Sequence, residues 1–256
     1  MKKWYFVAGL VILSFVFVTQ GCAAEECKDI TLQTLQTHVP FPFPPGTKIV
    51  SKREVKGLCE IIVNVKGRDL SLYLAKDFVI LGQMFSHKKN ISFQEAERLQ
   101  AKQFLALRKE AEKVVAISYT PSPQAQHTVY MFTDPLCPWC QKAGSQTKEI
   151  ADTYNVAVKV IFCPYKGKEE AIEVVCRKLD LSTYLKEDWK KEEKTKDYQC
   201  EEGKKLVDAS MNLGKKLGVS GVPTFYLDNG KRVVGANIPQ LKQTLSNLTG
   251  KKEKGE

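Results

Sequence analysis

The clearest hydropathy pattern lies in the second half of the chain, where short apolar runs alternate with amphipathic stretches. Strands are predicted from apolar, β-branched or aromatic runs at 128–133, 156–162, 224–228 and 232–235. Helices are predicted from apolar positions at helical spacing in 141–154, in 169–216 and from Pro239 onward. The order is a β-α-β unit followed by a hairpin. It predicts an α/β fold with a mixed sheet, helices on both faces and a helical insertion.

The first half has a different pattern, in which strand-like runs precede one long helix. The strand-like runs lie at 48–54, 58–65 and 70–75 and are separated by turn residues. Helical spacing follows from Ser92 to Val115, and Ser92 with Glu95 forms a capping-box signature at its start. Because Pro121-Ser-Pro123 cannot continue a helix, we place a domain boundary near 118–125.

The first residues carry a third pattern. Two lysines at positions 2 and 3 precede an apolar run from Trp4 to Val18, which is too short to span a membrane and is typical of a secretory signal. Small residues at 22–24 allow cleavage before Glu25. Lipid attachment to Cys22 is the alternative, although Thr19 stands where lipoprotein signals usually carry Leu. We expect export and, after cleavage, a soluble periplasmic protein.

These patterns divide the chain into segments. They are a signal peptide at 1–24, an N-terminal domain at 25–90, a linker helix at 91–120, an α/β domain at 121–250 and a disordered tail at 251–256. With 256 residues, 43% of them hydrophobic, the chain can form two modest cores. The net charge of +10 comes from lysines interleaved with acids, as in 186–196, so we expect solvated faces and no nucleic-acid partner.

The candidate chemistry is a pair of thiols, Cys137 and Cys140, at the junction of the predicted strand 128–133 and helix 141–154. Positions i and i+3 share one face of a helix, so these thiols can reach each other. Unpaired N–H groups and the positive end of the helix dipole favour a thiolate at Cys137, the expected nucleophile, while Cys140 is expected to resolve.

Two other interpretations of this pair are a zinc half-site and an inert structural disulfide. A zinc site needs a second pair of ligands, but the sequence has no other Cys-x-x-Cys and only three scattered histidines. We therefore expect no metal and no cofactor.

The remaining cysteines become informative if the protein is exported to an oxidising compartment. Seven of the eight remain as thiols after either processing route, so at least one is free or pairs between chains. Cys176 and Cys200 are expected to form a structural disulfide, which would close a loop of about 25 residues and stabilise by roughly 3 kcal/mol. Cys27 and Cys59 are expected to staple the N-terminal domain, with a redox pair as the alternative. Cys163 is the expected free thiol, either a buried small side chain or part of the active-site rim.

A second candidate element is Gly218-Val-Ser-Gly-Val-Pro223, directly before the predicted strand 224–228. After a Cys-x-x-Cys in this order of elements, it resembles the cis-proline loop of the thioredoxin fold. The resemblance implies that Pro223 lies against the Cys137 sulfur and that the Val222 backbone pairs with an extended substrate. Pro138 and Trp139 would complete the substrate-binding surface. The alternative is an ordinary trans proline that opens a strand.

Three features together resemble the bacterial periplasmic disulfide isomerases of the DsbC/DsbG type. They are Phe132-Thr-Asp-Pro-Leu-Cys-Pro-Trp-Cys140, the Cys176/Cys200 pair and Leu217-Gly-Val-Ser-Gly-Val-Pro223. The resemblance is close over 125–250 and extends to the N-terminal half in layout only. It implies a thioredoxin-like catalytic domain, a small α+β, cystatin-like dimerisation domain at 25–90 and a V-shaped homodimer. It also implies misfolded or disulfide-bonded exported proteins as substrates and a membrane thiol-disulfide reductase as recycling partner.

The chain departs from that family at positions that touch the chemistry. Pro-Trp replaces the usual Gly-Tyr or Pro-Tyr between the cysteines, and Val222 replaces Thr before the proline. Met131 stands where thioredoxin has a buried acid. We expect Pro-Trp and Val222 to tune the direction of electron flow. The sequence thus predicts isomerisation or reduction of incorrect disulfides; the alternatives are a chaperone or holdase with secondary redox activity, and a monomeric thiol oxidase or electron-transfer thioredoxin.

Overall fold

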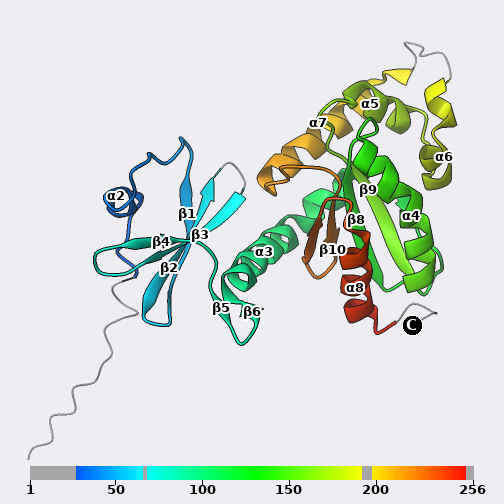
Figure 1. Cartoon of the computed structure of the whole chain (residues 1–256). Helices are drawn as coiled ribbons and strands as arrows, with labels where there is room; N and C mark the ends of the chain where they lie inside the picture. The colour runs from blue at the N-terminus through cyan, green and yellow to red at the C-terminus, as the bar shows by residue number, and fades with distance from the viewer. Residues whose placement is uncertain (1–26, 66–67, 192–197, 252–256) are drawn as a thin grey trace, which may run out of the picture.

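The structure, a computed structural model, describes residues 27–65, 68–191 and 198–251. The expected signal peptide at 1–24, Cys22 and residues 252–256 of the expected tail lie outside these ranges. Figure 1 shows a small sheet and a larger sheet, with the long helix α3 (Ile91–Lys113) running from one to the other. Within the described ranges, no helix is both long enough and apolar enough to cross a membrane.

The small sheet is an antiparallel meander of strands in the order β1-β2-β3-β4. The strands are β1 (Lys48–Val55), β2 (Leu58–Val65), β3 (Arg68–Leu74) and β4 (Val79–Leu81), followed by the short ribbon β5 (Phe85–Ser86) and β6 (Lys89–Asn90). The first three strands follow the predicted ranges. The turn between β1 and β2 consists of Lys56 and Gly57, both with positive φ, as a two-residue hairpin turn with the correct twist requires.

One face of the small sheet is covered by α2 (Leu32–Gln36) and the segment that precedes it. The shared core consists of Cys27, Ile30, Leu35, Ile61, Val63 and Leu72. A disulfide between Cys27 and Cys59, with 5.4 Å between the Cα atoms, joins this segment to β2. The N-terminal segment is therefore fixed to the sheet both by apolar packing and by a covalent bond.

The start of α3 differs from the sequence prediction. Its N-cap is Asn90, whose side chain accepts a first-turn N–H at 3.0 Å. Ser92 and Glu95 are buried instead, and their side chains bond elsewhere. Ser92 hydrogen-bonds to the Tyr73 hydroxyl, and the Glu95 carboxylate accepts two bonds from the Arg98 guanidinium group, at 2.6 and 2.8 Å. The predicted capping box is therefore wrong, because packing against the small sheet gives both side chains other partners.

The larger sheet has five strands in the order β11-β10-β8-β9-β7. Its strands are β7 (Ile117–Tyr119), β8 (His127–Thr133), β9 (Val156–Phe162), β10 (Thr224–Leu227) and β11 (Arg232–Val234). β8 and β9 are parallel and joined by α4 (Pro138–Tyr154), whereas every other pair is antiparallel. The predicted mixed sheet, with its β-α-β unit and hairpin, is confirmed. β7 is an addition, and it lies in the segment that the sequence assigned to the linker.

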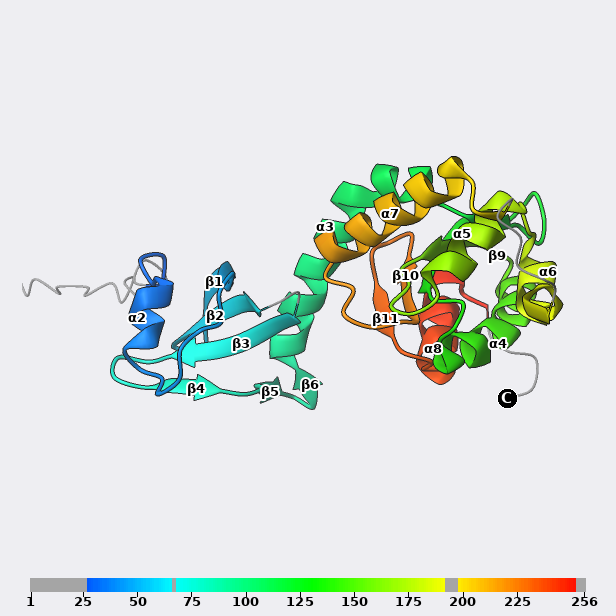
Figure 2. The same cartoon turned by 90° about the horizontal axis from the view of Figure 1, so that it is seen from above.

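Helices cover both faces of this sheet, as predicted. The stretch 169–216 is divided into α5 (Lys168–Cys176), α6 (Leu181–Lys186), the 3-10 helix η1 (Asp188–Lys191) and α7 (Glu201–Lys216), and α8 (Ile238–Thr249) ends the fold. Successive side chains of β8 point to opposite faces: Val129 and Met131 pack with α4 and α8, whereas Tyr130 and Phe132 pack with α3 and α7. Figure 2 shows these two helix layers.

The second half of α3 belongs to the core of the larger sheet. The Phe104 ring stacks on Tyr226 with 4.5 Å between centroids and meets Tyr130 edge-on at 5.2 Å. Phe104 is fully buried. The helix is therefore anchored on the sheet that carries the dithiol, and the small sheet is attached to its first turns.

Candidate active site

The dithiol lies where β8 gives way to α4, at an interior strand of the larger sheet. Cys137 is the N-cap residue of α4, with an extended backbone (φ −85°, ψ 117°), and Pro138 occupies the first helical position. The Cys137 side chain makes no capping bond and is partly exposed, so its sulfur is accessible at the end of the helix where backbone N–H groups lack partners. The element order predicted for this motif is present.

Cys140 lies one turn further along α4 in a different environment. The residue is 2% exposed, and burial raises the pKa of its thiol to about 12. The nearby Thr133 hydroxyl acts in the opposite direction and lowers this pKa. The Thr133 hydroxyl oxygen is itself buried and meets no hydrogen-bond partner of standard geometry in the described part of the chain. It is therefore available to donate to a Cys140 thiolate. Sequence reasoning did not single out Thr133.

The proline loop reaches the dithiol from the start of β10. The Val222–Pro223 peptide bond is cis, and the Cys137 thiol lies 3.7 Å from the Val222 carbonyl oxygen. The contact follows from strand order, because β10 pairs with β8 and places Thr224 opposite Phe132. The structure thus brings Cys137, Val222 and Pro223 together.

The residues between the cysteines form the outer surface of the site. Pro138 is exposed, and Trp139 is 62% exposed with the Lys142 ammonium group 5.7 Å from its ring centroid. An exposed indole next to a thiol provides an apolar surface on which a polypeptide can pack.

A buried carboxylate that the sequence did not point to organises the loops around the dithiol. Asp134 is 2% exposed and accepts four backbone N–H bonds, from Leu136 (2.8 Å), Tyr165 (2.8 Å), Lys166 (3.0 Å) and Gly167 (3.1 Å). These bonds join the loop before Cys137 to the loop after β9. A Cβ atom at position 167 would stand 2.6 Å from an Asp134 carboxylate oxygen, so the contact requires glycine. The Asp-Pro pair indicates a turn, but no local pattern could indicate partners more than thirty residues away.

The other described cysteines form two disulfides and one buried thiol. A disulfide joins Cys176 to Cys200, with 5.8 Å between Cα atoms, across the helical insertion, and the Cys27–Cys59 disulfide belongs to the small sheet. Cys163 is a thiol buried beneath α7, where a Cβ atom on Gly214 would lie 2.5 Å from its sulfur; burial raises its pKa to about 11. Of the two interpretations of Cys163, the geometry matches the buried small side chain.

A zinc half-site was one of the two other interpretations of the cysteine pair. Over the ranges that the structure covers, no three or more His, Cys, Asp or Glu side chains are grouped so that they could hold a metal ion. The arrangement at Cys137 is that of a thiol exchange site: an accessible sulfur at a helix N-terminus, with a second sulfur behind it.

Comparison with known proteins agrees with this geometry. Residues 115–249 match the family described as thioredoxin-like domain. The chain is 28% identical over 180 residues to the thiol:disulfide interchange protein DsbC of Escherichia coli K12, covering 66% of this chain and 70% of that protein. The DsbC of Salmonella typhimurium is also 28% identical, over 184 residues, with 66% and 69% covered.

Among solved structures, the thiol-disulfide exchange protein α-DsbA2 of Wolbachia pipientis superposes with a TM-score of 0.50. Its sequence is 14% identical, and the match covers 60% of this chain and 98% of that one, which supports the fold. The chain therefore belongs to the thioredoxin-like domain family and is a DsbC-like thiol-disulfide oxidoreductase.

Proposed function

We propose that this protein isomerises incorrect disulfides in exported proteins, with Cys137 as the nucleophile and Cys140 as the resolving thiol. The observation that carries the proposal is the contrast between the two sulfurs. Cys137 is partly exposed at a helix N-terminus, whereas Cys140 is buried and its pKa is raised to about 12.

The reaction begins when the Cys137 thiolate attacks one sulfur of a substrate disulfide. A mixed disulfide forms, and the second substrate sulfur leaves as a thiolate. In isomerisation, a substrate thiolate attacks the mixed disulfide, a new substrate disulfide forms and the Cys137 thiolate is released, with no net transfer of electrons. In reduction, Cys140 attacks instead; a Cys137–Cys140 disulfide forms, and the substrate leaves with both of its sulfurs reduced.

The burial of Cys140 favours isomerisation over reduction. Only the thiolate is a nucleophile, and a thiol with a pKa of about 12 is almost entirely protonated at neutral pH. Cys140 therefore attacks the mixed disulfide slowly, which leaves time for a substrate thiol to attack it first.

Substrate binding is assigned to the surface around Cys137. The backbone of Val222 would pair with an extended segment, while Pro223, Pro138 and Trp139 would contact its side chains. Main-chain pairing is independent of side-chain identity, so this mode suits misfolded chains of many sequences.

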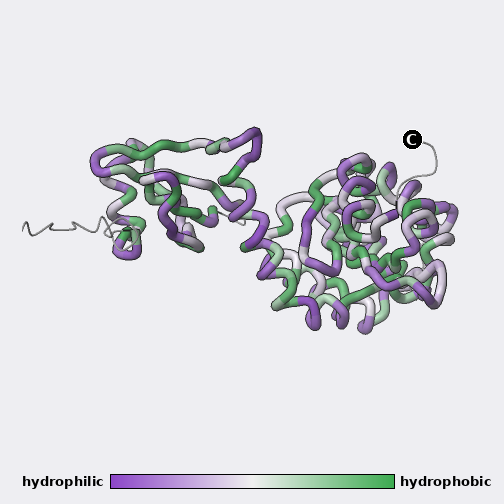
Figure 3. The backbone as a smooth tube through the Cα atoms, turned by 90° about the horizontal axis from the view of Figure 1, so that it is seen from below, coloured by the Kyte–Doolittle hydropathy of each residue, from purple (hydrophilic) through white to green (hydrophobic). Residues whose placement is uncertain are grey.

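We further propose that residues 25–90 form a cystatin-like dimerisation domain, that 91–120 form the linker helix and that 121–250 form the catalytic domain. β4 is the end strand of its sheet and carries exposed apolar side chains, with Ile80 45% and Phe85, just beyond it, 63% exposed. Figure 3 shows this run as a hydrophobic stretch along the outer border of the small unit. An end strand of this kind pairs readily with another strand, and a second copy is its proposed partner.

In the proposed setting, the N-terminal segment directs the chain to the periplasm and is then removed. Isomerisation requires Cys137 to be reduced at the start of each cycle. A membrane thiol-disulfide reductase is therefore the proposed partner that restores the dithiol after each oxidation by substrate.

The proposal is tested by refolding scrambled ribonuclease with single variants. Cys137→Ala should lose all activity, because no nucleophile remains, whereas Cys140→Ala should retain a substantial part, because isomerisation needs only the first thiol. Cys163→Ala is the matched control and should act like the unaltered protein, since that thiol is buried beneath α7. Complete loss of activity in Cys140→Ala would instead identify a reductase.

A further inference from the structure

We infer that the cleft between the small sheet and the larger sheet is a subsite for acidic side chains of the polypeptide substrate. These side chains would belong to residues near the substrate cysteine whose disulfide reacts with Cys137. The inference rests on the proposed function and adds a substrate preference to it. It is carried by two adjoining cavities, by their charge and by their continuity with the proline loop.

The first cavity has a volume of about 360 Å³ and lies between β1, α3 and the end of α7. Lys48 lines it from the small sheet, and Arg232 and the segment Lys215–Gly218 line it from the larger unit. A second cavity of about 470 Å³ shares Lys48, Lys215 and Gly218 and extends to Ser220. Together they form a continuous hollow along the entrance to the proline loop.

The hollow carries a net positive charge. Lys48, Lys215 and Arg232 form no ion pair with any residue in the described ranges. Asp69 is the acid among the lining side chains, and amide donors occupy its oxygens: Asn64 at 2.6 Å and Gln100 at 3.2 Å. A cleft lined by one sign of charge concentrates ligands of the other sign.

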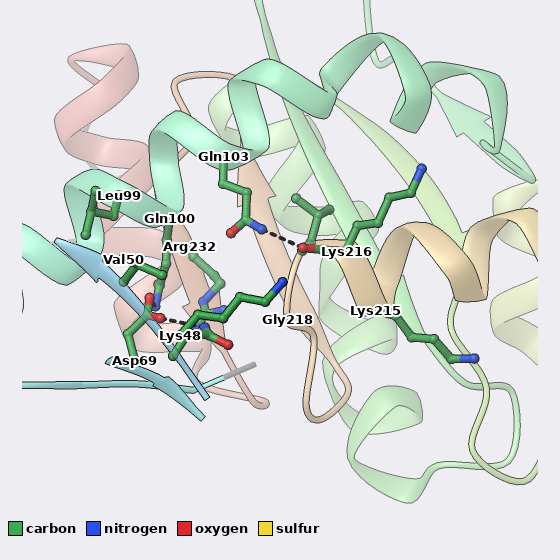
Figure 4. A pocket seen from close by; sticks show the side chains of 12 residues that line it. Lys48, Val50, Asp69, Leu99, Gln100, Gln103, Lys215, Lys216, Gly218 and Arg232 are labelled. Atoms are coloured by element: carbon green, nitrogen blue, oxygen red, sulfur yellow. Dashed lines mark hydrogen bonds between the residues drawn. The ribbon is translucent and has the colours of Figure 1, made fainter. Parts of the chain in front are cut away.

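Lys48 and Lys215 line the hollow at two separate places rather than at one point. Figure 4 shows the Lys48 side chain reaching toward the loop at Gly218, while Lys215 points out of the first cavity on its far side.

The loop connects this hollow to the reacting sulfur. Ser220 lines the second cavity, and the Val222 carbonyl oxygen, two residues later, lies 3.7 Å from the Cys137 sulfur. Two residues of chain span at most about 7 Å, and the loop bends at 221–223. A substrate segment that pairs with Val222 would therefore place residues two to four positions from its cysteine at the cavities, where a carboxylate would meet Lys48 and Lys215.

The test compares three short peptides that differ only beside their disulfide, with Glu, Gln or Lys three residues from the cysteine. The reduced full-length protein reacts with each, and the rate of disulfide loss is followed after acid quench. At low salt the Glu peptide should react about fivefold faster than the Lys peptide, the factor expected from one exposed ion pair. At 0.5 M salt the rates should converge, because that salt screens exposed charges.

Variants separate a local subsite from the general positive charge. Lys48→Glu with Lys215→Glu should reverse the preference between the Glu and Lys peptides. An unchanged circular dichroism spectrum and melting temperature verify that the variant is folded. The double variant Lys204→Glu with Lys205→Glu makes the same charge change on α7 but lies outside both cavities, and it should keep the wild-type preference.

Equal rates for all three peptides at low salt, or an equal effect of the Lys204→Glu, Lys205→Glu control, would overturn the inference and leave the proposed function intact. Failure of the wild-type protein to react with any peptide would contradict the proposed function and, with it, this inference.

Discussion

At the scale of single residues, the fold places two identical side chains in opposite environments. Cys137 caps the helix at the surface, and Cys140, one turn later, is buried beneath it beside the Thr133 hydroxyl. The thioredoxin-type buried acid is replaced by Met131, which is also buried. The Thr133 hydroxyl and the Asp134 backbone N–H are thus the polar groups that are placed to stabilise a thiolate at Cys140.

Thr133→Val should slow the attack of Cys140 on a mixed disulfide by about tenfold, the effect of losing one hydrogen bond to a charged sulfur. In the unaltered protein, that rate should rise about tenfold per pH unit up to pH 9, because a pKa of about 12 leaves the thiolate fraction far from saturation. Rapid-quench alkylation of a trapped mixed disulfide measures both effects. Thr147→Val, at a buried threonine of α4, is the control. Equal rates for the two variants, or a plateau near pH 8.5, would refute the role of Thr133.

At the scale of elements, the long periodic segments were predictable and the short ones were not. The hydropathy pattern predicted β8, α4 and β9, because each has at least seven residues, and it predicted the shorter β10 and β11 as a hairpin because the two apolar runs follow each other closely. β4 and β7 each have three residues, too few to show a period, and they form only because a neighbouring strand offers a free edge. Helical segments were predicted over 169–216, and the structure divides this stretch into α5, α6, η1 and α7.

The contact between α7 and β9 gives an element-scale prediction. Gly214→Ala should lower the free energy of unfolding by about 1 to 3 kcal/mol, because its methyl group would overlap the Cys163 sulfur. In the double variant with Cys163→Ala the sulfur is absent and the methyl group fits. The combined loss should therefore be clearly smaller than the sum of the single losses. Urea denaturation of the four proteins measures this coupling, and additive losses would show that the two residues do not interact.

At the scale of the whole molecule, the site combines segments that lie far apart in the sequence. The dithiol and the proline loop could be predicted, because each is a local motif with a chemical meaning of its own. Asp134 and the basic cleft could not, since the first depends on a loop beyond β9 and the second on residues from both sheets. The attachment of α3 to the core through Phe104 was also hidden, because helical spacing does not say which sheet a helix covers.

The dimer proposal makes a whole-molecule prediction. The full chain has a mass of 28.9 kDa. In light scattering the protein should have twice the mass of one chain from which the proposed signal peptide has been removed. Ile80→Glu should produce monomers at micromolar concentration, because it places a charge on the exposed end strand of the small sheet. Val234→Glu makes a similar change on β11, the end strand of the larger sheet, and should remain dimeric. A monomeric wild-type protein would contradict the proposed architecture.

The central claim is that Cys137 works as a reduced nucleophile whose buried partner seldom resolves the mixed disulfide. The most direct test is the redox state of Cys137 and Cys140 in the cells that make the protein, fixed by acid and measured by alkylation and mass spectrometry. The account predicts a pair that is mostly reduced. A pair found mostly as the Cys137–Cys140 disulfide would identify an oxidase and contradict the account.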